Sequence, residues 1–187
     1  GWVLFGGGIG GTTDDDPTIE RSVAVLPFVN MSGDSNNEYF SDGITEELLN
    51  ALAHLPELRV PGRTSSFAFK DGGLTIRQIA DTLDVAHVLE GSVRRQGETV
   101  LITAQLIDAQ TDGHLWSDTF ERELTDIFAI QREIATAIAD QLQVSLSGAE
   151  QARLVGEGTA SAEAYEAYLR GRYFWNQRTA ESIQTAI

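Results

Sequence analysis

The sequence of 187 residues predicts an α/β (α+β) fold, in which helices pack on a mixed sheet and the start of an all-α repeat follows. The first observation is a pair of β-α units, each an extended apolar run followed by a helical pattern. The second is a stretch of period-two alternation between polar turns, which indicates a three-strand antiparallel meander. The third is a C-terminal stretch with helical periodicity alone. Hydrophobic residues make up 42% of the chain and charged residues 22%, as is typical of globular proteins.

The first β-α unit begins with Ser22–Val29, SVAVLPFV, a Val-rich run typical of a strand covered on both faces. Pro27 has no backbone N–H to donate, so we expect it where the strand pairing ends or bulges. A helix is predicted to begin at Tyr39 or Ser41 and to end at Leu55, before Pro56. Its apolar face consists of Ile44, Leu48, Leu52 and Leu55.

The second unit begins with Leu58–Phe69, LRVPGRTSSFAF, predicted as a strand that bends near Pro61. Thr75 and Gln78 have the spacing of a capping box, which predicts a short helix. The buried face of that helix is Ile76, Ile79, Ala80 and Leu83. Residues 86–95, 99–109 and 114–123 form the predicted meander, and a further helix is predicted over residues 125–146.

The expected domain organisation has three parts, namely residues 1–21, 22–150 and 161–187. Residues 22–150 hold the α/β domain, and residues 161–187 begin a helical repeat. The uncharged Gly1–Gly11, GWVLFGGGIGG, is too short to span a membrane alone. It is either the last turns of a transmembrane helix or a flexible Gly-rich leader. If it is the end of a transmembrane helix, residues 1–21 form a membrane-proximal stub and an acidic linker.

Charge and composition exclude several classes of function. The chain has 13 Lys and Arg against 28 Asp and Glu, a net charge of −15. Its few, dispersed cations argue against binding to nucleic acid or to an anionic membrane surface. The absence of Cys excludes thiolate metal sites and a Cys nucleophile. His54, His87 and His114 are far apart in sequence, and we find no catalytic, cofactor-binding or metal-binding motif.

Two stretches are candidate binding sites. The polar loop from Asn30 to Gly43 leads into a helix N-terminus, an arrangement that suits an anion or another small ligand. Its candidate residues are Asn30, Asp34, Asn36, Glu38 and Asp42. The acidic ones weaken the case for an anion, and the alternative is a purely structural connection. The second stretch is a candidate partner face on the helix after Ser161, comprising Tyr165, Tyr168, Tyr173 and Trp175. The alternative there is ordinary packing, because aromatic stripes at helical spacing usually face a core.

Ala24–Lys70 resembles the TolB-like amino-terminal domain of bacterial multidomain proteins. The resemblance continues in Ala86–Arg95 (AHVLEGSVRR), Ile102–Ala109 (ITAQLIDA) and Asp126–Glu133 (DIFAIQRE), and covers about residues 22–146. It implies a domain similar to the α/β unit before the propeller of the periplasmic protein TolB. Such domains typically precede tetratricopeptide repeats, and Ala164–Trp175 (AYEAYLRGRYFW) resembles the opening helix of those repeats.

Members of that family often carry an adenylate/guanylate cyclase domain, a winged-helix DNA-binding domain or a protein kinase domain. This chain shows no motif of any of them, so the resemblance implies no catalytic residue here. We therefore expect a non-catalytic sensory or scaffolding module that binds proteins through its sheet edge and repeat surface, with no cofactor and no nucleic acid. The alternatives are a receptor for a small ligand, such as a nucleotide or an envelope fragment, and a part of a cyclase whose catalytic domain lies elsewhere.

The expected location is the periplasmic side of the inner membrane, with the N-terminal stub as a tether. No Lys or Arg precedes Arg21, which suits an outside flank under the positive-inside rule. The alternative is the cytoplasm.

Overall fold

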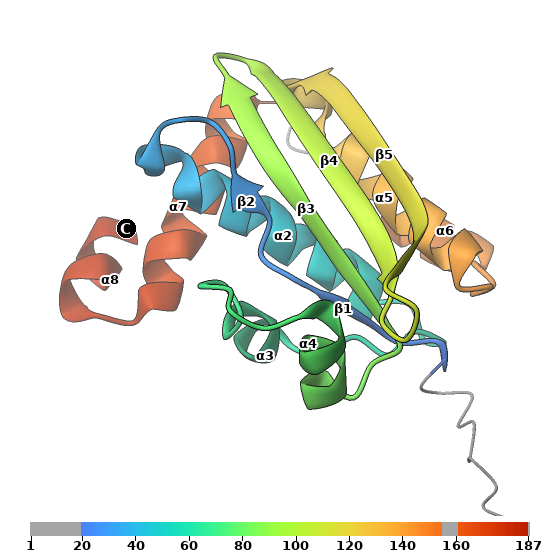
Figure 1. The fold of residues 1–187 in the computed structure, drawn as a ribbon. Helices are drawn as coiled ribbons and strands as arrows, with labels where there is room; N and C mark the ends of the chain where they lie inside the picture. Colours follow the sequence, from blue (N-terminus) through green and yellow to red (C-terminus); the bar gives the residue numbers. More distant parts are fainter. Residues whose placement is uncertain (1–19, 155–160, 187) are drawn as a thin grey trace, which may run out of the picture.

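The computed structural model describes residues 20–154 and 161–186, which form a mixed sheet with helices packed on it (Figure 1). The strand order is β1-β3-β4-β5, and β2 also pairs with β3. The strands are β1 (Val23–Val25), β2 (Val29–Asn30), β3 (His87–Gln96), β4 (Thr99–Asp108) and β5 (Gly113–Glu123). β1 and β2 run parallel to β3, whereas β3, β4 and β5 form an antiparallel meander. The predicted α+β fold class is confirmed.

The interruption between β1 and β2 is caused by Pro27, as its missing N–H predicted. The adjacent Phe28 turns into the core, where it is 1% exposed and its backbone N–H donates to Thr45 Oγ1 over 2.9 Å. Its ring packs on Gly91 of β3. A Cβ at Gly91 would lie 2.7 Å from this ring and 2.3 Å from the carbonyl oxygen of Thr103, so only glycine fits there.

The helices cover the two faces of the sheet unequally. α2 (Glu38–Ala53) and α5 (Ile127–Gln141) lie behind the sheet in Figure 1 and enclose the main core with it. On the opposite face, α4 (Ile76–Leu83) covers only the end of the sheet beside β1, through a smaller apolar cluster. The remaining elements are η1 (Ser35–Asn37), α3 (Arg63–Phe67), η2 (Leu124–Asp126), α6 (Gly148–Leu154), α7 (Ala162–Gln177) and α8 (Ala180–Ala186).

The predicted capping box is present: Thr75 accepts from the backbone of Gln78, whose side chain accepts from the backbone of Thr75. The strand predicted over residues 58–69 is wrong. Its only sheet-like contact is an isolated bridge between Ser22 and Arg59, after which the chain forms the short helix α3. The extended Gly62 precedes this helix, and the guanidinium carbon of Arg63 lies 4.1 Å from the centre of the Phe67 ring. This cation–π contact at i, i+4 belongs to a helix.

The helix predicted over residues 125–146 is shorter than expected. α5 ends at Gln141, because Gln143 adopts a left-handed backbone with φ 54°. The N–H of Val144 then donates to the carbonyl of Ala139 over 2.8 Å, which closes the helix end. The apolar stripe is nevertheless buried as predicted: Ile127, Ile130, Ile134 and Ile138 are each 0% exposed. α6, which no periodicity indicated, follows.

α7 is part of the same packing as the sheet domain. Tyr165 and Leu169 belong to the main core cluster, at 2% and 1% exposure. In Figure 1, α7 lies beside the N-terminal half of α2, and α8 folds back against it. Within the described residues, no helix is both long and apolar enough to cross a membrane. The predicted stub Gly1–Gly11 lies outside them.

Candidate functional site

The polar loop before α2 is shaped by its own side chains. Asn30 Nδ2 donates to the carbonyl of Asp34 over 2.9 Å, and its Oδ1 accepts from the N–H of Ser32 over 3.0 Å. Asp34 caps η1 by accepting from the N–H of Asn36 over 2.8 Å. Asn30 and Asp34 therefore use these polar atoms to fix the turn, as expected of Asx residues.

The two remaining acidic candidates, Glu38 and Asp42, lie on α2 and share one cation. Lys70 Nζ is 2.8 Å from Glu38 Oε1 and 2.6 Å from each carboxylate oxygen of Asp42. Burial raises the pKa of the Asp42 carboxyl, an effect that the hydrogen bond and charge of Lys70 oppose. Glu38 and Asp42 therefore share the single positive charge of Lys70, which leaves a net negative charge at this end of α2.

The residues of the predicted partner face on α7 differ in their exposure to solvent. Tyr165 is 2% exposed, its hydroxyl accepts from Gln131 Nε2 over 3.0 Å, and its ring meets Phe128 edge-on at 4.8 Å. Tyr165 therefore follows the alternative of ordinary packing, because the sheet domain already buries it. Tyr168 and Trp175 are exposed at 47% and 60% and stay accessible. Tyr173 is half-buried.

The centre of the α2–α7 junction is a contact between Leu169 and Gly43. A Cβ on Gly43 would lie 2.7 Å from Leu169 Cδ2, so the missing side chain lets α7 approach α2 closely. A buried leucine against a glycine gives a tight apolar contact with no polar partner to satisfy. Apolar packing therefore forms the centre of the junction, and charged residues surround it.

One charged group at the rim joins α7 to the sheet. Glu166 Oε2 lies 2.9 Å from Arg95 Nη2 on β3, and Glu166 Oε1 accepts from the Tyr39 hydroxyl over 2.5 Å. The hydrogen bond from Arg95 lowers the pKa of the Glu166 carboxyl. Burial and the nearby Glu166 raise the pKa of Tyr39 to about 12. Glu166 therefore binds as a carboxylate and Tyr39 as a neutral hydroxyl, which is the charge-assisted arrangement.

A second charged group holds the other end of α7 against α2. Arg172 donates to Glu46 and also to Glu47 Oε1, the latter over 2.5 Å. Arg63 Nε lies 3.2 Å from Glu46 Oε2, and Asn176 Nδ2 donates to the same oxygen over 3.1 Å. Glu46, whose side chain is 10% exposed, thus accepts from two residues of α7 and forms an ion pair with Arg63 of α3.

A cleft of about 580 Å³ opens between the N-terminal end of α2 and α7. It brings together Asn36 and Glu38 from the first predicted stretch and Tyr173 from the second, whereas Asn30, Asp34 and Asp42 do not line it. The α7 side of the cleft is Glu166, Arg170, Tyr173, Phe174 and Gln177. Sequence reasoning missed four of these, although their spacing of i, i+4, i+7, i+8 and i+11 is that of one helical face. This helical face mixes charged, polar and aromatic residues, so it shows no apolar stripe that would identify it.

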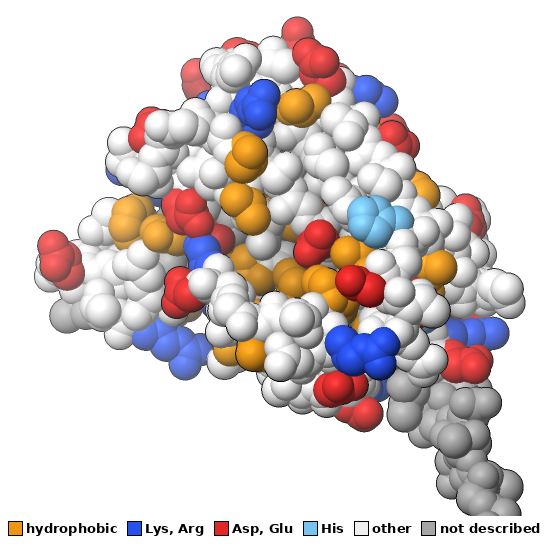
Figure 2. All heavy atoms as spheres, viewed as in Figure 1, with side chains coloured by type: hydrophobic (Ala, Val, Ile, Leu, Met, Phe, Trp, Pro, Cys, Tyr) orange, Lys and Arg blue, Asp and Glu red, His pale blue; other side chains and the backbone are white. Residues whose placement is uncertain are grey.

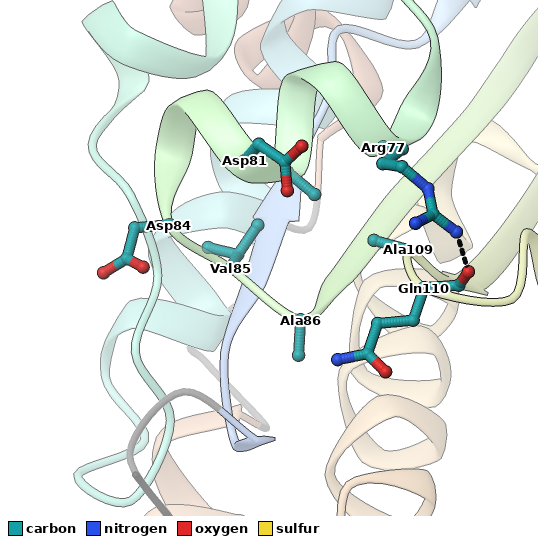
Figure 3. A pocket seen from close by; sticks show the side chains of 8 residues that line it. Arg77, Asp81, Asp84, Val85, Ala86, Ala109 and Gln110 are labelled. Carbon is teal, nitrogen blue, oxygen red and sulfur yellow. Dashed lines mark hydrogen bonds between the residues drawn. The ribbon is translucent and has the colours of Figure 1, made fainter. Parts of the chain in front are cut away.

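A smaller hollow of about 270 Å³ lies at the other end of the molecule, between α4 and the β4–β5 turn (Figure 3). Figure 3 shows Arg77 reaching across to the backbone oxygen of Gln110, to which it donates, while Asp84 points away from Asp81. The two carboxylates therefore do not converge as an acid–base pair would. In the described part of the chain, no group of three or more His, Cys, Asp or Glu is placed to hold a metal ion.

The pH dependence of the junction follows from Glu166. Its pKa in the folded protein lies below the ordinary value of 4.5, so its contribution to stability is fully present above pH 4.5. It is lost as the pH falls through the lower pKa of the folded state. The pKa of Asp42 is raised in the folded protein, so its contribution to stability changes with pH in the opposite direction. We expect the difference in unfolding free energy between wild type and Glu166→Gln to shrink below pH 4.5, measured by urea denaturation at several pH values.

Glu163→Gln removes a carboxylate from an exposed position of the same helix and serves as the control. A difference between wild type and Glu166→Gln that is independent of pH would show that the Arg95–Glu166 pair does not stabilise the junction.

The fold and junction define an α+β domain whose sheet carries a docked helical segment. A family described as "HilA/YgeH-like transcriptional regulator, second domain" matches residues 19–137, which is more than half of the chain. The chain belongs to this family.

Among curated proteins, the chain is similar to "Putative adenylate cyclase 3" of Rhizobium meliloti (strain 1021), with 46% identity over 151 residues. The match covers 81% of this chain and 26% of that protein, so the chain spans about a quarter of its relative's length.

Solved structures similar to the chain include TolB from Acinetobacter baumannii, with 14% identity, a TM-score of 0.49, and coverage of 65% of this chain and 28% of that one. Lipoprotein GNA1162 from Neisseria meningitidis has 22% identity, a TM-score of 0.46, and coverage of 68% and 99%. The C-terminal domain of LpoB from Salmonella enterica has 23% identity, a TM-score of 0.44, and coverage of 58% and 87%. At these TM-scores the similarities do not bear on function.

Proposed function

We propose that this chain is a non-catalytic module of a larger signalling protein, in which the α/β domain senses or binds a partner and passes its state to a helical segment. The observation that carries the proposal is the α2–α7 junction. Tyr165 and Leu169 of α7 are buried in the core of the sheet domain, and Glu166 and Arg172 bind charged groups on its surface. A helix held by both apolar and ionic contacts moves with the domain that holds it.

The relatives support a role inside a multidomain protein. The family is named for a transcriptional regulator and is its second domain, and the curated relative is named for a cyclase and is about four times the length of the matched part. On this proposal the output domain of our chain's parent, a cyclase or a DNA-binding domain, lies outside residues 1–187.

We further propose the domain organisation that the sequence predicts. Residues 22–150 are the α/β domain, and residues 161–187 begin tetratricopeptide repeats, with α7 and α8 as an antiparallel helix pair. Protein partners would bind the free edge of the sheet at β5 and the exposed surface of α7. The proposed location is the periplasmic side of the inner membrane, with the N-terminal segment as the tether.

The test uses the whole parent protein, with cyclic AMP formation as the output if its effector is a cyclase. Leu169→Asp places a carboxylate against Gly43 in the buried contact and is expected to detach α7. Burying an unpaired carboxylate costs several kcal/mol. This cost exceeds the stabilisation that a single contact between α7 and α2 provides. We expect the effector to keep its basal activity and to lose its response to stimulus. The 187-residue chain alone should form no cyclic AMP.

Ala167→Asp introduces the same charge at an exposed position of α7 and is expected to behave as wild type. Arg172→Gln is a milder variant that removes the ionic contacts to Glu46 and Glu47 and the contacts with Tyr168. It should weaken the response without unfolding the sheet domain, as followed by circular dichroism. A normal response in Leu169→Asp, with α7 shown to be detached by amide exchange, would refute coupling through this junction.

The second candidate function is a receptor for a small ligand, and the cleft of about 580 Å³ favours it. Asn36 of η1 and three residues of α7, namely Arg170, Tyr173 and Gln177, line this cleft together with Glu38 and Tyr39 of α2. A ligand that touches both α2 and α7 binds only when α7 is docked. It would therefore stabilise the junction by linkage, which makes the two candidate functions compatible.

A further inference from the structure

A groove of about 380 Å³ lies on the face of the sheet opposite the main core, beside α4 and the loop that precedes it. Its apolar side includes Pro27 and Val29 at the β1–β2 interruption and Phe69, Leu74 and Ile76 from the opposite wall. Neither the junction nor the cleft beside α7 shares these apolar residues. Figure 2 shows this face, with hydrophobic side chains gathered near its middle and acidic side chains beside them.

The groove carries two of the most exposed apolar side chains of the sheet domain. Val29 is 58% exposed and Leu74 is 47% exposed. Met31, two residues beyond Val29 and so on the same side of the extended chain, is 51% exposed and continues the apolar strip. Contiguous apolar surface of this kind on a soluble domain marks an interaction site more often than isolated residues do.

The floor of the groove is polar and carries one unpaired charge. Ser92, Thr103 and Gln105 project from β3 and β4, and Glu90 lies among them without an ion-pair partner in the described parts of the chain. Lys70, which also lines the groove, is bound to Glu38 and Asp42. The charge available to a ligand in the groove is therefore negative.

We propose that this groove, lined by Val29, Leu74 and Glu90, binds an amphipathic segment of another protein that presents large apolar side chains and a Lys or Arg. The apolar side chains would cover the strip from Leu74 to Met31, and the cation would pair with Glu90. This deepens the proposed function, because it names a surface and a partner chemistry for the protein-binding module. Apolar contacts would supply most of the affinity and the cation would supply orientation.

The charge of the chain argues against a second copy as the occupant. Two chains of net charge −15 repel each other, and the described residues that line the groove include no free cation for an acidic partner. A basic amphipathic segment is favoured by both the long-range field and the local carboxylate. The same field would attract any cationic peptide weakly, so the test must separate binding in the groove from general attraction.

The test titrates the isotope-labelled chain with a short amphipathic peptide of Leu and Lys and, separately, with a matched peptide of Leu and Glu, followed by NMR. We expect saturable binding of the Lys peptide with shifts at Val29, Leu74, Ser92 and Thr103, and weaker binding of the Glu peptide. Leu74→Ala removes the apolar side chain without adding a charge and should weaken binding of the Lys peptide about tenfold. Glu90→Lys should reduce the preference for the Lys peptide over the Glu peptide.

Glu98→Lys makes the same change of charge in the β3–β4 turn and is expected to keep the wild-type preference. Non-saturable shifts, shifts spread over the surface, or an equal effect of Glu98→Lys and Glu90→Lys would overturn the proposal. Self-association that Leu74→Ala abolishes, seen by analytical ultracentrifugation, would also overturn it in favour of a second copy. Because Leu169→Asp leaves the groove residues unchanged, a failed peptide titration would not affect the coupling test at the α2–α7 junction.

Discussion

Tyr165→Ala is expected to destabilise the protein by about 3–5 kcal/mol, the range for removing a buried aromatic side chain. Tyr165 is 2% exposed and packs edge-on against Phe128 of α5. The substitution leaves a cavity between α5 and α7 and removes the hydroxyl that accepts from Gln131, which then has an unpaired buried amide. Urea denaturation followed by circular dichroism measures the loss, and amide exchange in α7 shows whether the helix detaches first.

Two further variants separate the effect of the lost ring from the effect of the lost hydrogen bond and from that of removing any tyrosine from α7. Tyr165→Phe keeps the ring and removes only the hydrogen bond, so it should cost about 1 kcal/mol. Tyr168→Ala removes the same residue type from the same helix at a site that is 47% exposed, together with the hydrogen bonds of its hydroxyl with Glu47 and Arg172, and should cost about 1 kcal/mol. An effect of Tyr165→Ala no larger than that of Tyr168→Ala would mean that α7 does not share the core in solution.

Glu46→Ala is expected to destabilise the protein by about 2–3 kcal/mol. Glu46 accepts from Arg172 of α7 and pairs with Arg63 of α3, so its removal leaves two guanidinium groups close together without their shared carboxylate. A fully buried pair broken in this way costs about 3–5 kcal/mol. The cost is reduced here because both arginine side chains are 29% exposed and water can solvate them. Chemical denaturation again gives the value.

Glu57→Ala is the matched control for Glu46→Ala. Glu57 pairs with Arg21 over 2.6 Å, a good distance, but the two side chains are 46% and 42% exposed. An exposed pair of this kind contributes about 0.5 kcal/mol. If the two glutamate variants lose the same stability, burial of Glu46 between α2, α3 and α7 has no energetic effect, and the ionic part of the junction is incidental.

The candidate site could be predicted from the sequence only in part. The loop before α2 and the aromatic helix α7 were both singled out, because an Asx-rich loop and a helical stripe have local signatures. Their meeting in one cleft was not predictable, since no local pattern states which helix lies beside α2. Arg170 and Gln177 were missed for the same reason, and the apolar groove at Val29 and Leu74 involves residues far apart in the chain.

The sequence alone determined the alternation of apolar residues that places Ile127, Ile130 and Ile134 in the core and makes a meander of β3, β4 and β5. These features repeat with the period of the backbone, so each follows from near neighbours. Tertiary structure decided that the stretch after Leu58 becomes a helix and that Tyr165 is covered. The helix after Leu58 is joined to α2 by the ion pair between Arg63 and Glu46, in addition to its local Arg63–Phe67 contact. Tyr165 is covered because α7 docks on the core through contacts between distant segments, such as Leu169 on Gly43.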